Sequence, residues 1–225
     1  REPGRVFGAQ GEFIAAPWLD DLECVFAGTK AFLAANNPEN VTVLALFENE
    51  EIGSLTRQGA CSPFLKEVLH RICLSLGRSE EEELRAIAQG FMLSADNAHA
   101  VHPDSPEKSD PTNRCYLNGG VVVKHSPRYA SDALTAGIFQ KICQKAGVPV
   151  QVYYNNSKIP GGGTLGNASG AQVALPTVDI GLPQLSMHSP YETAGAKDLD
   201  YMVWAMKAFY ESVLVQTGRD VYSLR

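Results

Sequence analysis

The sequence lacks an excess of positive charge, and it also lacks long hydrophobic runs. Its 19 lysines and arginines are outnumbered by 25 aspartates and glutamates, which gives a formal net charge of -6. This balance argues against nucleic acid as the main partner. No apolar run reaches the roughly 20 residues that a membrane-spanning helix needs, so no membrane association is expected. The polar, glycine-rich start, REPGRVFGAQG, is unlike a secretory signal peptide.

Closely spaced cysteine pairs are lacking as well. An odd number of scattered cysteines is typical of reduced thiols in a cytosolic protein, so we expect a cytoplasmic location. Three Asn-x-Ser/Thr triplets, which start at positions 40, 155 and 167, then have no use as glycosylation sites. The five cysteines are Cys24, Cys61, Cys73, Cys115 and Cys143.

The sequence does have enough apolar residues for a core: 44% of its 225 residues are hydrophobic, which suits one large or two small domains. Helical and strand patterns alternate along the chain. This alternation predicts an α/β fold, in which a mixed, mostly parallel sheet lies between helices as a three-layer sandwich. We expect strands over 41–47, 91–96, 120–125, 148–154 and 177–182, and helices over 21–35, 62–76, 79–90, 132–147, 164–175 and 199–214.

Apolar spacing also predicts which faces of these elements are buried. The run VTVLALF over 41–47 is continuous, which is typical of a strand covered on both faces. Ser62 is the expected N-cap of the second helix, and Ser79 with Glu82 forms the capping box of the third. The expected buried residues are Leu22, Val25, Phe26 and Phe32 in the first helix and Leu65, Val68, Leu69, Ile72, Cys73 and Leu76 in the second.

Acidic residues and one histidine stand at the ends of these elements, where the sites of α/β proteins gather. Glu50 and Glu51 follow the strand over 41–47 side by side. A solvated turn explains one acid, so the pair suggests that one holds a metal and the other moves a proton. Zinc accepts carboxylate and imidazole ligands. A two-metal site needs about five to six protein ligands, so Asp20, Glu51, Asp96 and His188 are one short.

Several motifs leave alternatives open. GGGTLG, Gly161–Gly166, matches the dinucleotide fingerprint, but it lies about six residues past its strand. It also fits a turn into a helix, or a backbone surface that a substrate approaches closely. His99 and His102 fit structural roles better than a shared metal, because Pro103 disfavours a helix there. A lone histidine such as His188 is more often structural than a ligand, and helix capping explains one of the two acids in LDD.

Six motifs, taken in order, resemble those of the M18 family of metalloaminopeptidases, the aspartyl aminopeptidase and aminopeptidase I group. They are LDD, ENEEIGS, SADNAHAVHP, KHSPRYASDA, GGGTLG and MHSPYE. The resemblance runs from about Glu12 to about Val213. It implies a zinc-peptidase fold and a zinc aminopeptidase that removes the N-terminal residue from peptides. It also implies assembly into a large homo-oligomer, commonly a tetrahedral dodecamer.

The resemblance further implies a site with two zinc ions, for which Co²⁺ or Mn²⁺ are substitutes. Asp20 matches the bridging aspartate, Glu50 the general base, and Glu51, Asp96 and His188 the other ligands. The segments that match the substrate pocket contain Lys124, Gly162, Gly163 and Thr164. Lys124 could pair with an acidic substrate side chain.

The chain departs from the family pattern at its front. The family's first ligand histidine, in a His-x-Asp segment, precedes the bridging aspartate, whereas the first histidine here is His70. The dimerisation insert is missing too. We therefore expect residues 1–225 to be a catalytic domain that forms the C-terminal part of a longer chain. The alternatives are a related two-metal dipeptidase or deacylase, or a non-catalytic assembly protein, against which the retention of Glu50 and Glu51 argues.

Overall fold

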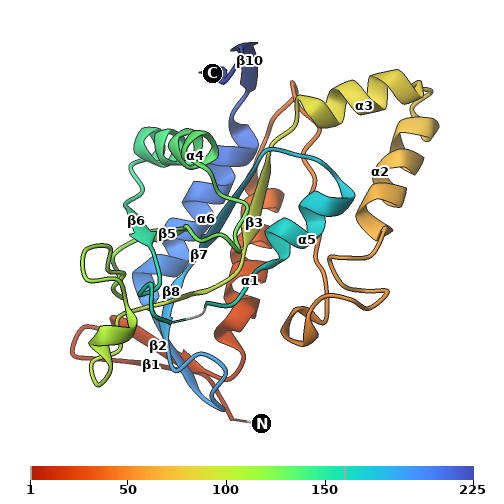
Figure 1. Ribbon diagram of the computed structural model, residues 1–225. Coiled ribbons are helices and arrows are strands. Elements are labelled where there is room, and N and C mark those ends of the chain that lie inside the picture. The colour runs from red at the N-terminus through yellow and green to blue at the C-terminus, as the bar shows by residue number, and fades with distance from the viewer. Residues whose placement is uncertain (1, 160) are drawn as a thin grey trace.

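The structure, a computed structural model, describes residues 2–159 and 161–225. Its central sheet has four strands (Figure 1). The two outer pairs of strands are parallel, and the middle pair, β7 with β5, is antiparallel. The sheet is therefore mixed, as predicted. In spatial order its strands are β3 (Met92–Ala95), β7 (Thr177–Gly181), β5 (Val121–Lys124) and β6 (Val150–Tyr153).

A second sheet of five short strands continues from the first, and the sequence patterns did not predict it. The chain passes from β3 into β4 through Asp96 and Asn97, and from β7 into β8 through Leu182. The junction of the two sheets therefore contains Asp96. The spatial order is β1 (Arg5–Phe7), β2 (Phe13–Ala16), β9 (Glu192–Gly195), β8 (Pro183–Leu185) and β4 (Ala98–His99), and a separate hairpin joins β10 (Leu214–Gly218) to β11 (Val221–Leu224).

Helices cover both faces of the central sheet, which confirms the α/β prediction. On one face α1 (Leu19–Ala34), α4 (Ala133–Ala146) and α6 (Ala196–Glu211) build the main core. Alternate residues of β7 point to opposite faces, so Val178 and Ile180 join this core. The other face contacts α5 (Leu165–Gln172), on which α2 (Phe64–Ser75) packs in turn, and α3 (Glu80–Ala88) follows α2.

The first helix forms where predicted, but it buries a different face. Leu22 and Phe26 are 56% and 49% exposed, whereas Ala27 and Ala31 are fully buried. The reason is the close approach of α1 to α6: a Cβ added at Gly28 would lie 3.6 Å from the sulfur of Met206. Small residues permit this approach, so the large apolar side chains remain outside.

The predicted strand over 41–47 is wrong. The segment has no strand assignment, and Val41 is 79% exposed. A run of apolar residues becomes a strand only when a neighbouring strand satisfies its backbone groups, and none of the strand pairings found in 2–159 and 161–225 includes it. The run therefore lies partly at the surface: Val41, Val43 and Leu46 are exposed, and its other side chains are half-buried.

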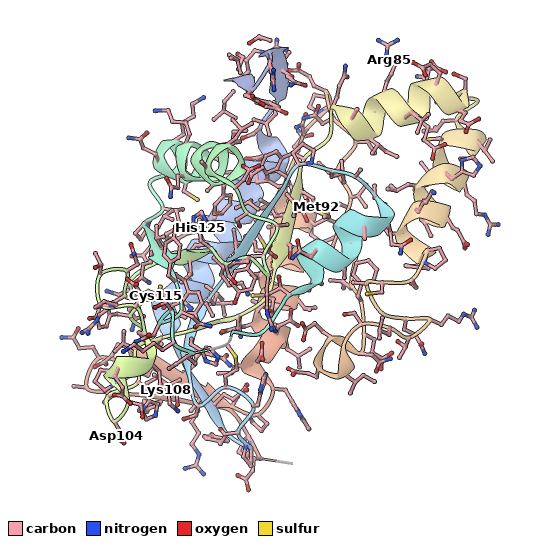
Figure 2. All side chains as sticks on the ribbon, in the orientation of Figure 1. Arg85, Met92, Asp104, Lys108, Cys115 and His125 are labelled. Atoms are coloured by element: carbon pink, nitrogen blue, oxygen red, sulfur yellow. The ribbon has the colours of Figure 1, made fainter. Side chains whose placement is uncertain are left out.

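Helices α2 and α3 extend to one side of the molecule, and Arg85 on α3 points away from it (Figures 1 and 2). The Ser79–Glu82 capping box is present in both directions, as predicted. The N-cap of α2 is Pro63, one residue after the predicted Ser62, although Oγ of Ser62 accepts a hydrogen bond from the backbone nitrogen of Phe64 at 3.4 Å. Of the predicted buried residues of α2, Leu65 alone is buried.

Candidate metal centre

Three of the four predicted ligands lie together. One ligand atom each from Asp20, Glu51 and His188 falls within 4.8 Å of the others. The Nε2 atom of His188 is 3.1 Å from Oδ2 of Asp20 and 3.2 Å from Oε2 of Glu51. Asp20 lies at the start of α1, Glu51 in the short 3₁₀ helix η1 (Glu50–Ile52), and His188 between β8 and β9.

The backbone at this cluster is unusual. His188 and Asn49, which precedes Glu50, have φ angles of 66° and 63°. Residues other than glycine rarely adopt this left-handed conformation, and such residues concentrate at functional sites. The peptide bond between Asp20 and Asp21 is cis. The two segments that supply Glu51 and His188 are therefore held in particular conformations rather than extended freely.

The fourth candidate, Asp96, lies beside the cluster but outside it. Its Oδ2 accepts a hydrogen bond from Nζ of Lys124 at 3.1 Å. The same ammonium group donates to the backbone oxygens of Asp96 and Asn97 at 3.0 and 2.9 Å. Lys124 is only 1% exposed. It was predicted to contact substrate, but in this structure it is buried and paired with Asp96, a predicted metal ligand.

Burial, together with crowded carboxylates, raises the pKa values of the acids at the cluster. Burial, followed by the charges of Asp96 and Glu51, raises the pKa of Asp20 to about 9. The same causes raise the pKa of Glu50 to about 7, although Lys124 offsets part of the effect. Burial and Asp96 also raise the pKa of Asp21 to about 6. The site concentrates more negative charge than its neighbours neutralise, so it favours a cation.

The donor set fits zinc. Oδ1 of Asp20 is buried and has no hydrogen-bond partner among the described residues, although buried polar atoms are normally satisfied. Its other oxygen faces His188. Carboxylate oxygens and an imidazole nitrogen are zinc ligands, and a cation at this point would give the orphaned oxygen a partner.

The glycine-rich loop is fixed at one end. Gly162 and Gly163 are exposed, while Oγ1 of Thr164 donates to Oδ1 of Asp179 at 2.6 Å. Pro160, which precedes the loop, lies outside the described residues. Residues 154–164 separate the end of β6 from the start of α5. This is not the tight strand-to-helix turn of a dinucleotide site, so the geometry favours the other readings of the loop.

Sequence reasoning gave no role to two buried acids. Glu192 stands in the motif MHSPYE, four residues after His188. This closeness to a predicted ligand is the only feature of the sequence that could have pointed to a role for Glu192. Asp179 lies within β7 and is fully buried. Besides Thr164, it accepts hydrogen bonds from Oγ of Ser94 at 2.6 Å and from the backbone nitrogen of Ala130 at 2.5 Å. Asp179 thus joins β3, the glycine-rich loop and the segment before α4.

A model of the family described as "Aminopeptidase I zinc metalloprotease (M18)" matches residues 1–210. The chain belongs to the M18 family. It is 44% identical over 211 residues to a probable M18 family aminopeptidase 2 of Clostridium acetobutylicum, an alignment that covers 93% of this chain and 49% of that protein. The chain therefore spans about half the length of the curated relatives that it matches. This finding confirms the resemblance on which the assignment of the site rests.

Solved structures of other proteins share the fold. The structure of Ape4 in complex with Nbr1 matches with a TM-score of 0.88 at 35% identity, covering 93% of this chain and 41% of that one. The mApe1 dodecamer of S. cerevisiae matches with a TM-score of 0.80 at 30% identity, covering 93% and 48%. No helix in the described part of the chain is both long enough and apolar enough to cross a membrane.

Proposed function

We propose that this chain carries the catalytic residues of a zinc-dependent aminopeptidase, which hydrolyses the peptide bond after the N-terminal residue of peptides. The observation that carries the proposal is the convergence of Asp20, Glu51 and His188 next to Glu50. Because the chain spans about half the length of its relatives, we assign the activity to the full-length protein. In that protein a further histidine completes the ligands.

Asp20, Glu51, Asp96 and His188 would hold two zinc ions, with Asp20 as the ligand common to both. Bound zinc supplies a water of lowered pKa and polarises the scissile carbonyl. The orphaned oxygen of Asp20 supports the sharing role, because the other oxygen already faces His188. Asp96 would bind through the carboxylate oxygen that Lys124 does not contact.

Glu50 is the proton carrier in this proposal. Burial and the charges of Asp96 and Glu51 raise the pKa of Glu50 to about 7 in the metal-free site, which brings this carboxylate towards the range in which a side chain both accepts and returns a proton. The same pKa makes the protonated form a competent donor to the leaving amine.

The exposed backbone of Gly162 and Gly163 is our candidate for the substrate surface, with Thr164 as its fixed end. That Lys124 contacts an acidic substrate side chain stays a prediction. Its ammonium group already has three oxygen partners here, so we assign it the task of holding Asp96.

Assembly and location complete the proposal. The structural similarity to the mApe1 dodecamer supports a large homo-oligomer for the full-length protein. All five cysteines are free in the structure, which suits the reducing cytoplasm.

The test is a substrate panel with the purified full-length protein. Peptides with a free N-terminus should lose their first residue, and the activity should vanish with a zinc chelator and return with zinc. Cleavage of N-acylated peptides at an equal rate would favour a deacylase or dipeptidase instead. Equal rates for N-terminal Leu and Asp would exclude an acidic preference.

A further inference from the structure

We infer that Glu192 is a positioning residue that joins the two chain segments presenting Asp20 and His188 to the metal. The inference rests on the proposed zinc function, because it takes the side chains of Asp20 and His188 to be metal ligands. The hydrogen bonds that hold their backbones are those of the structure.

The evidence is a pair of hydrogen bonds to one buried carboxylate. Oε2 of Glu192 accepts from the backbone nitrogen of Asp20 at 2.9 Å, and Oε1 accepts from the backbone nitrogen of His188 at 2.7 Å. Asp20 and Glu192 are 172 residues apart in the chain. Glu192 is 2% exposed. One side chain therefore connects the backbones of two residues whose own side chains meet at the cluster.

The carboxylate starts from a rigid base. Glu192 opens β9, and its Cα pairs with that of Ala16 in β2, while the next residue, Thr193, pairs with Leu185 in β8. A strand paired on both sides cannot shift by itself. Through its two hydrogen bonds, Glu192 therefore fixes the segments of Asp20 and His188, which lie outside the second sheet, to a strand within that sheet.

Both segments need such support. Asp20 has non-helical φ and ψ angles of -84° and 113°, so its backbone nitrogen belongs to no regular turn of α1, and the cap residue Trp18 offers no side-chain hydrogen bond. His188 has a φ of 66°, a conformation that persists only where the surroundings impose it. A buried carboxylate also needs donors, and these two N–H groups provide them.

Glu192 is not itself one of the clustered ligands. Its two oxygens each have a backbone donor, and it lies outside the group of Asp20, Glu51 and His188. Its task is to orient ligands, as groups one layer behind a metal do.

The molecule offers a matched control in Asp198. This acid, in the first turn of α6, is also fully buried, and it also accepts from two backbone nitrogens: Asn118 at 2.5 Å and Gly120 at 2.8 Å. Neither donor belongs to a ligand residue. Changing either acid to its amide replaces one oxygen by an NH₂ group that faces an N–H donor.

The experiment measures zinc affinity in competition with a chelator of known affinity, using full-length wild type, Glu192→Gln and Asp198→Asn. We expect both variants to lose thermal stability. Glu192→Gln alone should weaken zinc binding, by roughly 10- to 100-fold, the range found when groups behind metal ligands are changed. Co²⁺ absorption spectra should change in Glu192→Gln and not in Asp198→Asn, because they report the geometry of the ligands.

Equal zinc affinity in wild type and Glu192→Gln would overturn the inference, as would an equal loss in both variants. A wild-type protein that binds no zinc would instead overturn the proposed function. If Glu192→Gln does not fold, Glu192→Asp replaces it. This variant keeps the charge but is one methylene shorter, so its affinity should also fall, and an unchanged affinity would contradict the role.

Discussion

Glu50 and Glu51 are neighbours in the sequence, yet the structure gives them different surroundings. The side chain of Glu51 is 56% exposed and lies next to His188, so it is free to hold a metal. Burial and nearby charges raise the pKa of Glu50 to about 7, which suits proton transfer. The difference in environment, rather than residue type, supports the two proposed roles.

Glu50→Gln should reduce kcat by at least roughly 10²-fold, the usual contribution of a positioned base. The amide keeps the shape of the side chain but cannot accept the proton. Zinc content, measured by atomic emission, should stay at the wild-type level. Glu48→Gln, an exposed acid in the same loop, is the control and should have wild-type kcat. A zinc-loaded Glu50→Gln protein with normal turnover would remove Glu50 from the mechanism.

The raised pKa values predict how stability depends on pH. Asp20 moves from 3.8 to about 9 and Glu50 from 4.5 to about 7 on folding. Between its unfolded and its folded pKa, each acid holds its proton in the metal-free native state but has lost it in the unfolded state. The stability of the metal-free protein therefore falls as pH rises from about 4 to about 9. Zinc replaces those protons. Scanning fluorimetry from pH 5.5 to 8.5 should show the Tm gap between zinc-loaded and chelated protein widening. A constant or narrowing gap would contradict the electrostatic picture.

The sequence was informative at this scale where chemistry limits the choice of residue. Few residue types bind zinc, and the structure brings Asp20, Glu51 and His188 together, although the strand expected before Glu51 does not form. The sequence was uninformative about Glu192, because its partners are backbone N–H groups, and every residue except proline has one. Only the folded geometry shows which N–H groups a buried acid meets.

Among the elements, the glycine-rich loop depends most on a single side chain. Asp179 in β7 accepts hydrogen bonds from Thr164 in the loop, from Ser94 in β3 and from the backbone of Ala130. A Cβ at Gly166 would lie 2.5 Å from one of its oxygens, so the start of α5 can pack here only with glycine. The acid thus anchors the proposed substrate surface to the sheet.

Asp179→Asn should lower the free energy of unfolding by about 2–3 kcal/mol, because an amide leaves at least one buried donor unpaired. Thr164→Val removes one of these hydrogen bonds and should cost about 1 kcal/mol. Urea denaturation of both variants measures the difference. A cost for Asp179→Asn no larger than that for Thr164→Val would show that the other contacts matter little.

Element types could be predicted from the sequence, but their packing could not be predicted as well. All six α-helices and four of the five predicted strands form near the expected residues. Apolar spacing predicted the wrong buried face of α1, because the prediction gave weight to large apolar side chains and none to small ones. The contact with α6 instead selects the small side chains of Ala27, Gly28 and Ala31. The second sheet escaped notice because its strands are too short to show alternation.

At the scale of the whole molecule, the proposed oligomer makes a direct prediction about mass. Full-length protein studied by multi-angle light scattering should have the mass of a large closed assembly, in line with the dodecameric neighbour. The net charge of -6 does not oppose this, because apolar contacts decide association locally. A monomer with full activity would show that assembly is not required.

The partly exposed run over 41–47 has a consequence for anyone who produces this chain. VTVLALF has seven residues of mostly high β-propensity, with no charge, proline or glycine, which is the composition of segments that stack into cross-β fibrils. Val41, Val43 and Leu46 are 79%, 43% and 51% exposed. Expressed in isolation, these 225 residues should collect in inclusion bodies. A single gatekeeper charge, Val43→Lys, should move the chain into the soluble fraction.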